Sequence, residues 1–80
     1  MINKDNVRQS EYIIVINEKA NIADALIIFR KYDARLVRDL KKKRFLIELK
    51  RDPGLERLKS LVESSELIEF IQPNYIYQQQ

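Results

Sequence analysis

The sequence has no cysteine and no histidine among its 80 residues. Without cysteine the chain can form no disulfide framework and no thiolate metal site. Without histidine it cannot assemble a Ser–His–Asp nucleophile system, and without either residue it cannot assemble a Cys–His system. No window approaches the roughly 20 apolar residues that a membrane-spanning helix needs. We therefore expect a non-enzymatic chain with no cofactor, no metal and no membrane partner.

Glycine and proline are also scarce, with one and two copies, so long flexible linkers are not expected. Apolar residues make up 45% of the chain and charged residues 34%, which is typical of a globular protein. The charge is unevenly spread: residues 30–59 carry a net charge of +7, and the rest of the chain carries −4. Residues 70–80 bear no charged side chain, so a basic middle precedes a neutral, aromatic end.

The first half of the chain predicts a strand, a helix and a second strand. Residues 11–17 are rich in β-branched side chains and apolar on both faces, which indicates a strand covered on both sides. Asn21 is a candidate helix N-cap with Asp24 in the capping-box position, and apolar residues at helical spacing continue to Tyr32. Residues 35–40 form a weaker strand whose charges are typical of a sheet edge.

The second half predicts the same kinds of element in the order strand, helix, strand. A turn of three lysines leads into a strongly apolar strand over residues 44–49. Asp52 is expected to cap the second helix, with Pro53 as its first residue. A last strand over residues 67–71 is expected to stop at Pro73.

The order β-α-β-β-α-β predicts an α+β fold of the ferredoxin-like kind. Its four-stranded antiparallel sheet carries both helices on one face, with the first and third strands in the middle. Residues 1–10 are expected to form a flexible N-terminal segment, residues 11–74 the domain and residues 75–80 an extended C-terminal tail.

One face of such a sheet has no helix over it. The first strand is apolar on both faces, and Leu46, together with one of Phe70 and Ile71, must also point away from the helices. We therefore expect Leu46, Phe70 and Ile71 to mark an open sheet face that a partner covers, because monomers rarely expose large apolar patches. The alternative is a set of scattered surface apolar residues, which are common.

The C-terminal tail carries Tyr75, Ile76 and Tyr77 without any charge that would favour solvation. It is either a disordered end or a segment that adds to another protein as a β-strand.

The layout and two sequence blocks resemble the propeptides of subtilisin-like serine proteases, of the inhibitor I9 type. The blocks are Tyr-Ile-Ile-Val at residues 12–15 and Ile-Glu-Phe-Ile-Gln-Pro-Asn-Tyr-Ile-Tyr at residues 68–77. Such propeptides carry a last strand of the Val-Glu-Tyr-Val-Glu-Pro-Asn kind just before their cleavage site, and the resemblance covers residues 11–80. Two departures are Ser65-Glu66, where the family often has Asp-Pro, and the absence of glycine at residues 32–34.

The resemblance implies a propeptide that acts as an intramolecular chaperone and, after autoprocessing of the zymogen, as a product-like protease inhibitor. Its partner is the protease domain of the same precursor, whose two parallel surface helices receive the open sheet face. The residues after the last strand, Gln72 and Asn74, would cap the N-termini of these helices. The tail would lie in the substrate cleft, with the residues Tyr75, Tyr77, Gln78, Gln79 and Gln80. Gln80 would fill the first specificity pocket and Tyr77 the fourth.

A narrower resemblance is to the propeptides of the Csp-type germination proteases of spore-forming anaerobes. The chain is rich in Ile, Lys and Asn, and no apolar segment of signal-peptide length follows Met1. The narrower resemblance implies an intracellular, spore-associated location.

The alternative function is nucleic-acid binding through the basic turn of Lys41, Lys42, Lys43 and Arg44. Ferredoxin-like sheets that bind RNA stack bases on aromatic residues of their central strands, and here only Phe45 is available. A four-residue basic turn is more often a solvated hairpin, so nucleic acid is the less favoured partner. A third alternative is a self-associating ligand-sensing domain, to which Ile27 and Ile28 would contribute if they are not part of the core.

Overall fold

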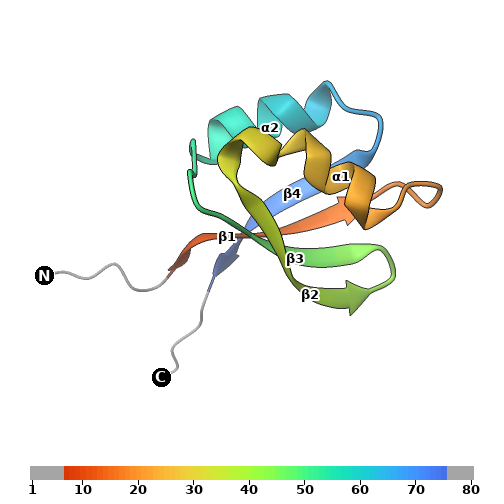
Figure 1. Ribbon diagram of the computed structural model, residues 1–80, viewed down its shortest axis with the longest axis horizontal. Helices are drawn as coiled ribbons and strands as arrows, with labels where there is room; N and C mark the ends of the chain where they lie inside the picture. Colours follow the sequence, from red (N-terminus) through yellow and green to blue (C-terminus); the bar gives the residue numbers. More distant parts are fainter. Residues whose placement is uncertain (1–6, 76–80) are drawn as a thin grey trace, which may run out of the picture.

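The structure is a computed structural model that describes residues 7–75 of the chain. It is an α+β fold with one four-stranded antiparallel sheet in the order β2-β3-β1-β4 and both helices on the same side, as a ferredoxin-like arrangement requires (Figure 1). The elements are β1 (Val7–Ile16), α1 (Ile22–Ile28), the short 3-10 helix η1 (Arg30–Tyr32), β2 (Ala34–Lys41), β3 (Arg44–Leu49), α2 (Leu55–Glu63) and β4 (Ile68–Tyr75).

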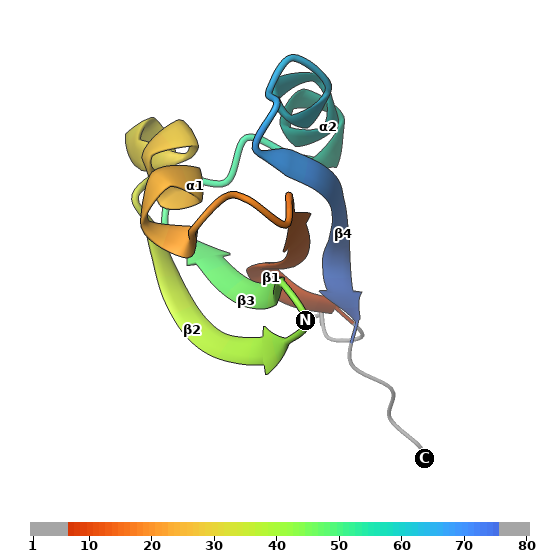
Figure 2. The ribbon, with the colours of Figure 1, turned by 90° about the vertical axis from the view of Figure 1, so that its right-hand side faces the viewer.

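The strand order follows from the apolar pattern of the strands. β1 and β3 lie in the middle of the sheet, and the charged β2 lies at one edge, which confirms both predictions. Figure 2 shows the sheet curling beneath the two helices, with β2 below α1 and β4 below α2. The helix-facing side chains of β1 and β3 therefore lie between the helices and the curved sheet.

The start of α1 is the predicted one. Asn21 is the N-cap, and its side-chain oxygen accepts a hydrogen bond of 3.0 Å from the backbone N–H of Asp24. The helix ends at Ile28, but the chain continues through η1 to Tyr32 and reverses at Asp33, whose φ of 57° lies in the left-handed region. The predicted end near Tyr32 thus marks the end of the whole helical segment.

The start of α2 differs from the prediction. Gly54, not Asp52, is the N-cap, and the helix begins at Leu55. Gly54 has a φ of 101°, a backbone conformation that residues with a Cβ rarely adopt. Asp52 instead accepts a 2.8 Å hydrogen bond from the N–H of Gly54 and a bond from the Tyr12 hydroxyl, so its carboxylate holds the loop before the helix.

The two outer ends of the sheet are longer than predicted. β1 begins at Val7, so residues 7–10, expected in a flexible segment, lie in a strand opposite the end of β4. Pro73 does not stop β4, which continues to Tyr75. Proline is tolerated here because β4 is an edge strand, where one side of the backbone needs no ladder partner.

The core lies between the helices and the sheet. Its six largest fully buried side chains come from both layers and are Phe29, Ile14, Ile16, Ile47, Leu49 and Leu58. Burying side chains of this size stabilises a fold by roughly 1.5–3 kcal/mol each. Ile28 packs against this cluster, whereas its neighbour Ile27 is 60% exposed.

Candidate functional site

The side of the sheet without helices is the candidate docking surface. Tyr12, Ile14 and Ile16 point into the core, so alternation along the strand places their neighbours on the other side. The same alternation applies to β3 and to residues 70–74 of β4. We call the resulting surface the open face; its members are Glu11, Ile13 and Val15 of β1, Arg44, Leu46 and Glu48 of β3, Phe70, Gln72 and Asn74 of β4, and Arg35 and Arg38 of β2.

The apolar part of the open face is smaller than predicted. Leu46 belongs to it but is only 7% exposed, since Ile13 lies opposite it on one side and Arg38 on the other. Phe70 lies opposite Val15 and is 51% exposed. The open face therefore has a shielded apolar centre and one protruding aromatic residue on the edge strand.

Ile71 does not belong to the open face. It lies opposite Ile14, is 3% exposed and packs in the helix-facing core. Its assignment to the open face was wrong because successive residues of a strand point to opposite sides, and Phe70 occupies the outward position.

A row of polar side chains crosses all four strands at one end of the open face. Arg35 of β2 forms an ion pair of 2.8 Å with Glu48 of β3. Glu48 lies directly opposite Glu11 of β1, and Glu11 accepts a 3.0 Å hydrogen bond from the side-chain nitrogen of Asn74 on β4. Like charges directly opposite one another destabilise a sheet, so Arg35 and Asn74 offset the repulsion between the two carboxylates.

The two residues expected to cap partner helices have different surroundings. Gln72 is exposed on the open face, so its side-chain oxygen can accept a hydrogen bond from a partner. Asn74 is half-buried, and its amide nitrogen is already bonded to Glu11. Among the expected tail residues, only the backbone of Tyr75 is described, at the end of β4; Tyr77, Gln78, Gln79 and Gln80 lie outside the described residues.

The basic turn is partly used by the fold itself. The ammonium group of Lys43 donates a 2.7 Å hydrogen bond to the carbonyl of Ala20, and the Arg44 guanidinium donates to the carbonyls of Leu40 and Lys41. Lys41 and Lys42 are exposed. Two of the four basic groups are therefore held against the protein surface.

The open face offers no aromatic platform on its central strands. Phe45 is 8% exposed and lies in the core, on the helix side of β3. The open-face residues of β1 and β3 are aliphatic or charged, and the exposed aromatic residue Phe70 lies on the edge strand. Base stacking of the kind that RNA-binding sheets use has no support on these two strands.

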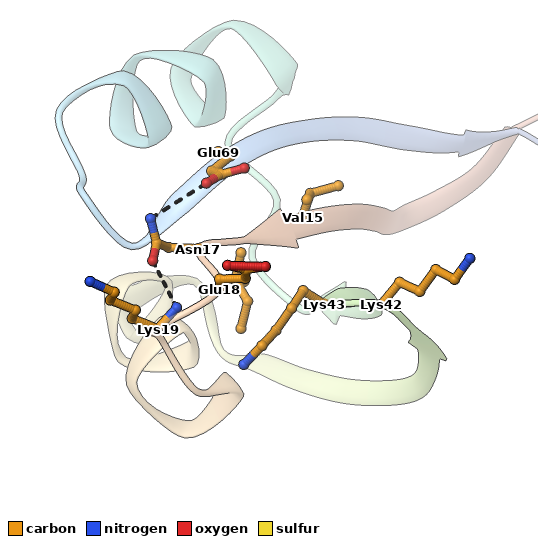
Figure 3. Close-up of a pocket in the computed structure, with 8 residues that line it drawn as sticks. Val15, Asn17, Glu18, Lys19, Lys42, Lys43 and Glu69 are labelled. Carbon is orange, nitrogen blue, oxygen red and sulfur yellow. Dashed lines mark hydrogen bonds between the residues drawn. The ribbon is translucent and has the colours of Figure 1, made fainter.

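A hollow of about 640 Å³ lies between the β1–α1 loop and the basic turn (Figure 3). Its lining residues are Val15, Ile16, Asn17, Glu18, Lys19, Lys42, Lys43 and Glu69. Asn17 occupies both of its polar atoms there, because it donates to Glu69 at 3.4 Å and accepts from the N–H of Lys19 at 2.8 Å. The lining charges are of both signs, so the hollow favours neither an anion nor a cation.

Among residues 7–75, no group of three or more Asp or Glu side chains is placed to hold a metal ion. No helix in this part of the chain is long and apolar enough to cross a membrane.

Comparisons with family models, curated proteins and solved structures gave no match. Function is therefore inferred from the open face, the edge strand β4 and the sequence resemblance.

Glu11 and Glu48 are open-face residues that sequence reasoning missed as part of the site. The signal was present, because each lies two residues from an outward-facing apolar residue in its own strand, Ile13 and Leu46 respectively. What the sequence does not contain is the register, which places the two carboxylates opposite each other.

Proposed function

We propose that this domain is the propeptide of a subtilisin-like serine protease, which it helps to fold and then inhibits, without catalysing a reaction itself. The observation that carries the proposal is the position of Phe70. It protrudes from the helix-free side of the sheet, and it lies on the same strand that runs through Pro73 to Tyr75. A docking surface and the segment that leads to the tail are thus parts of one strand.

In this proposal the protease covers the open face. Phe70 and Val15 supply apolar contact, and the exposed Gln72 accepts hydrogen bonds at the N-terminus of a protease helix, where backbone N–H groups lack partners. The tail lies in the substrate cleft as a strand, with Tyr77 and Gln80 in specificity pockets. Because the docked domain holds the tail near the cleft, the effective concentration of the tail is raised and cleavage product remains bound.

The narrower resemblance extends this proposal to location. As the propeptide of a germination-type protease, the chain would be intracellular and associated with spores. Fractionation of spores and vegetative cells, followed by detection of the chain, tests this part separately.

The docking surface can be tested with two matched variants. Phe70 and Ile27 are both large exposed apolar residues, 51% and 60% exposed, but Phe70 is on the open face and Ile27 is on α1, on the opposite side of the domain. Binding to a bacterial subtilisin with a chemically blocked catalytic serine is measured by titration calorimetry. We expect Phe70→Asp to weaken binding by tenfold or more and Ile27→Asp to leave it unchanged; equal effects would contradict docking through the open face.

Nucleic-acid binding is the second candidate, and the exposure of Lys41 and Lys42 within the basic middle of the chain favours it. It requires that affinity for a single-stranded oligonucleotide falls steeply with salt and with the double substitution Lys41→Glu and Lys42→Glu. It also requires that Phe70→Asp has no effect. The buried position of Phe45 and the internal hydrogen bond of Lys43 weigh against this function.

A further inference from the structure

At one end the sheet narrows to two strands. The pairing of β1 with β3 extends to Glu11, opposite Glu48, whereas β1 also lies beside β4 as far out as Val7, opposite Tyr75. We call residues 7–11 the N-terminal arm. In Figure 1 the arm and the end of β4 project together from the sheet, away from the helices.

The arm is not a regular continuation of the ladder. Between the pairs Val7–Tyr75 and Tyr12–Pro73, the arm side advances five residues while β4 advances two. Ser10 has a φ of 69°, in the left-handed region, within this irregular stretch. Backbone pairing alone is therefore sparse here, and a two-stranded ribbon is at best marginally stable in water.

A side-chain contact ties the arm to β4 where the irregular stretch ends. The side-chain nitrogen of Asn74 donates to a carboxylate oxygen of Glu11 at 3.0 Å, and both residues are half-buried. A hydrogen bond to an ionised carboxylate is stronger than a neutral one. The contact fixes Asn74, and so the last residue of β4, relative to the arm.

We propose that the N-terminal arm positions the end of β4: the Glu11–Asn74 bond and the Val7–Tyr75 pair fix the direction of the backbone at Tyr75. This inference rests on the proposed function, in which the residues after Tyr75 enter a protease cleft. A segment whose direction is fixed before binding loses less conformational entropy when it binds, so it binds more tightly. Asn74 is then a positioning residue that acts through Glu11, and it is not a cap on a partner helix.

The substitution Asn74→Asp separates the two roles because they predict opposite results. As a helix cap, a carboxylate would interact better with the helix dipole than an amide does, so inhibition would strengthen. As a tie to Glu11, a carboxylate would replace the donor with a second negative charge, so inhibition would weaken. We expect the inhibition constant against subtilisin to rise by about tenfold or more, the size of effect that ordering one further residue produces.

Two further variants complete the test. Gln72→Glu makes the same change of charge on the same strand and face, at an exposed position opposite Ile13, and should leave the arm undisturbed. Glu11→Gln combined with Asn74→Asp exchanges the amide and the carboxylate, so it should restore the bond and return the inhibition constant to within about threefold of the original.

Amide hydrogen exchange of Tyr75 in the free chain is the readout that needs no protease. We expect faster exchange in Asn74→Asp, wild-type exchange in Gln72→Glu and recovery in the double variant. Unchanged exchange in Asn74→Asp overturns the inference, as does stronger inhibition by that variant. If exchange responds as expected but the wild-type chain inhibits no subtilisin, the hold of the arm on Tyr75 is supported and the proposed function is overturned.

Discussion

The hydroxyl of Tyr12 donates one hydrogen bond shared between the two carboxylate oxygens of Asp52, at 2.9 and 2.8 Å, and so joins the central strand β1 to the loop before α2. The two residues are 40 positions apart in the chain. Tyr12 is 6% exposed, and the same carboxylate accepts from the N–H of Gly54. The contact engages the carboxylate of Asp52 in the loop, and Gly54 takes the N-cap position of α2.

Tyr12→Phe should therefore destabilise the domain. It removes the hydroxyl donor from an ionised acceptor, and such bonds contribute about 1.5–3 kcal/mol. Thermal unfolding is the measurement, and the melting temperature should fall by at least about 6 °C for a domain of this size. Tyr32→Phe is the control, since the ring of Tyr32 packs against the core and lies beside the Lys31 ammonium group; it should change stability by less than about 0.5 kcal/mol. Equal losses in the two variants would show that the Asp52 contact is not stabilising.

The basic turn contains removable backbone strain. Lys41, Lys42 and Lys43 have φ values of 74°, 60° and 64°, and the left-handed conformation costs a residue with a Cβ roughly 1–2 kcal/mol. Asparagine adopts this conformation more readily, and it is common at the first position of a two-residue hairpin loop. Lys42→Asn should raise the free energy of unfolding by about 0.5–1 kcal/mol, measured by urea denaturation. Lys50→Asn removes the same charge from an exposed position outside the turn and should not raise the free energy of unfolding. An equal rise in that variant would mean that the loss of a positive charge, and not the relief of strain, stabilises the domain.

The N-cap of α1 should matter because the helix is short. Asn21→Ala removes the acceptor for the Asp24 N–H and should cost about 1 kcal/mol. Asn21→Ser keeps a side-chain oxygen at the cap and should retain most of the stability. Circular dichroism during urea unfolding distinguishes the two, and identical midpoints for the Ala and Ser variants would contradict the capping role.

The strand order could be predicted from the sequence, but which side chains of β4 point to the core and which to the open face could not. β1 and β3 are the strands with the longest apolar runs, and the structure places both in the centre. In β4, the register shifts so that Ile68 lies opposite Ile16 and Phe70 opposite Val15. This irregularity at Glu69 reverses the alternation, so Ile68 and Phe70 point to opposite sides although they are two residues apart. A period of two in the sequence cannot reveal such a shift.

The remaining differences arise from contacts between distant parts of the chain. Asp52 has the sequence signature of an N-cap, but the Tyr12 hydroxyl binds its carboxylate. Residues 8–10 are polar, so residues 7–10 carry no strand signal of their own, and they are placed in β1 by the end of β4. Glu11 and Asn74 lie 63 residues apart, so their bond appears only once the sheet is formed.

The most direct test of the docking proposal is the inhibition constant of the full chain against a panel of bacterial subtilisin-like proteases hydrolysing a chromogenic peptide, with chymotrypsin as the control protease. The account predicts tight inhibition of at least one subtilisin-like protease and none of chymotrypsin, and a loss of inhibition when residues 78–80 are deleted. Equal inhibition of chymotrypsin, or no inhibition of any subtilisin-like protease at micromolar chain concentration, would contradict it.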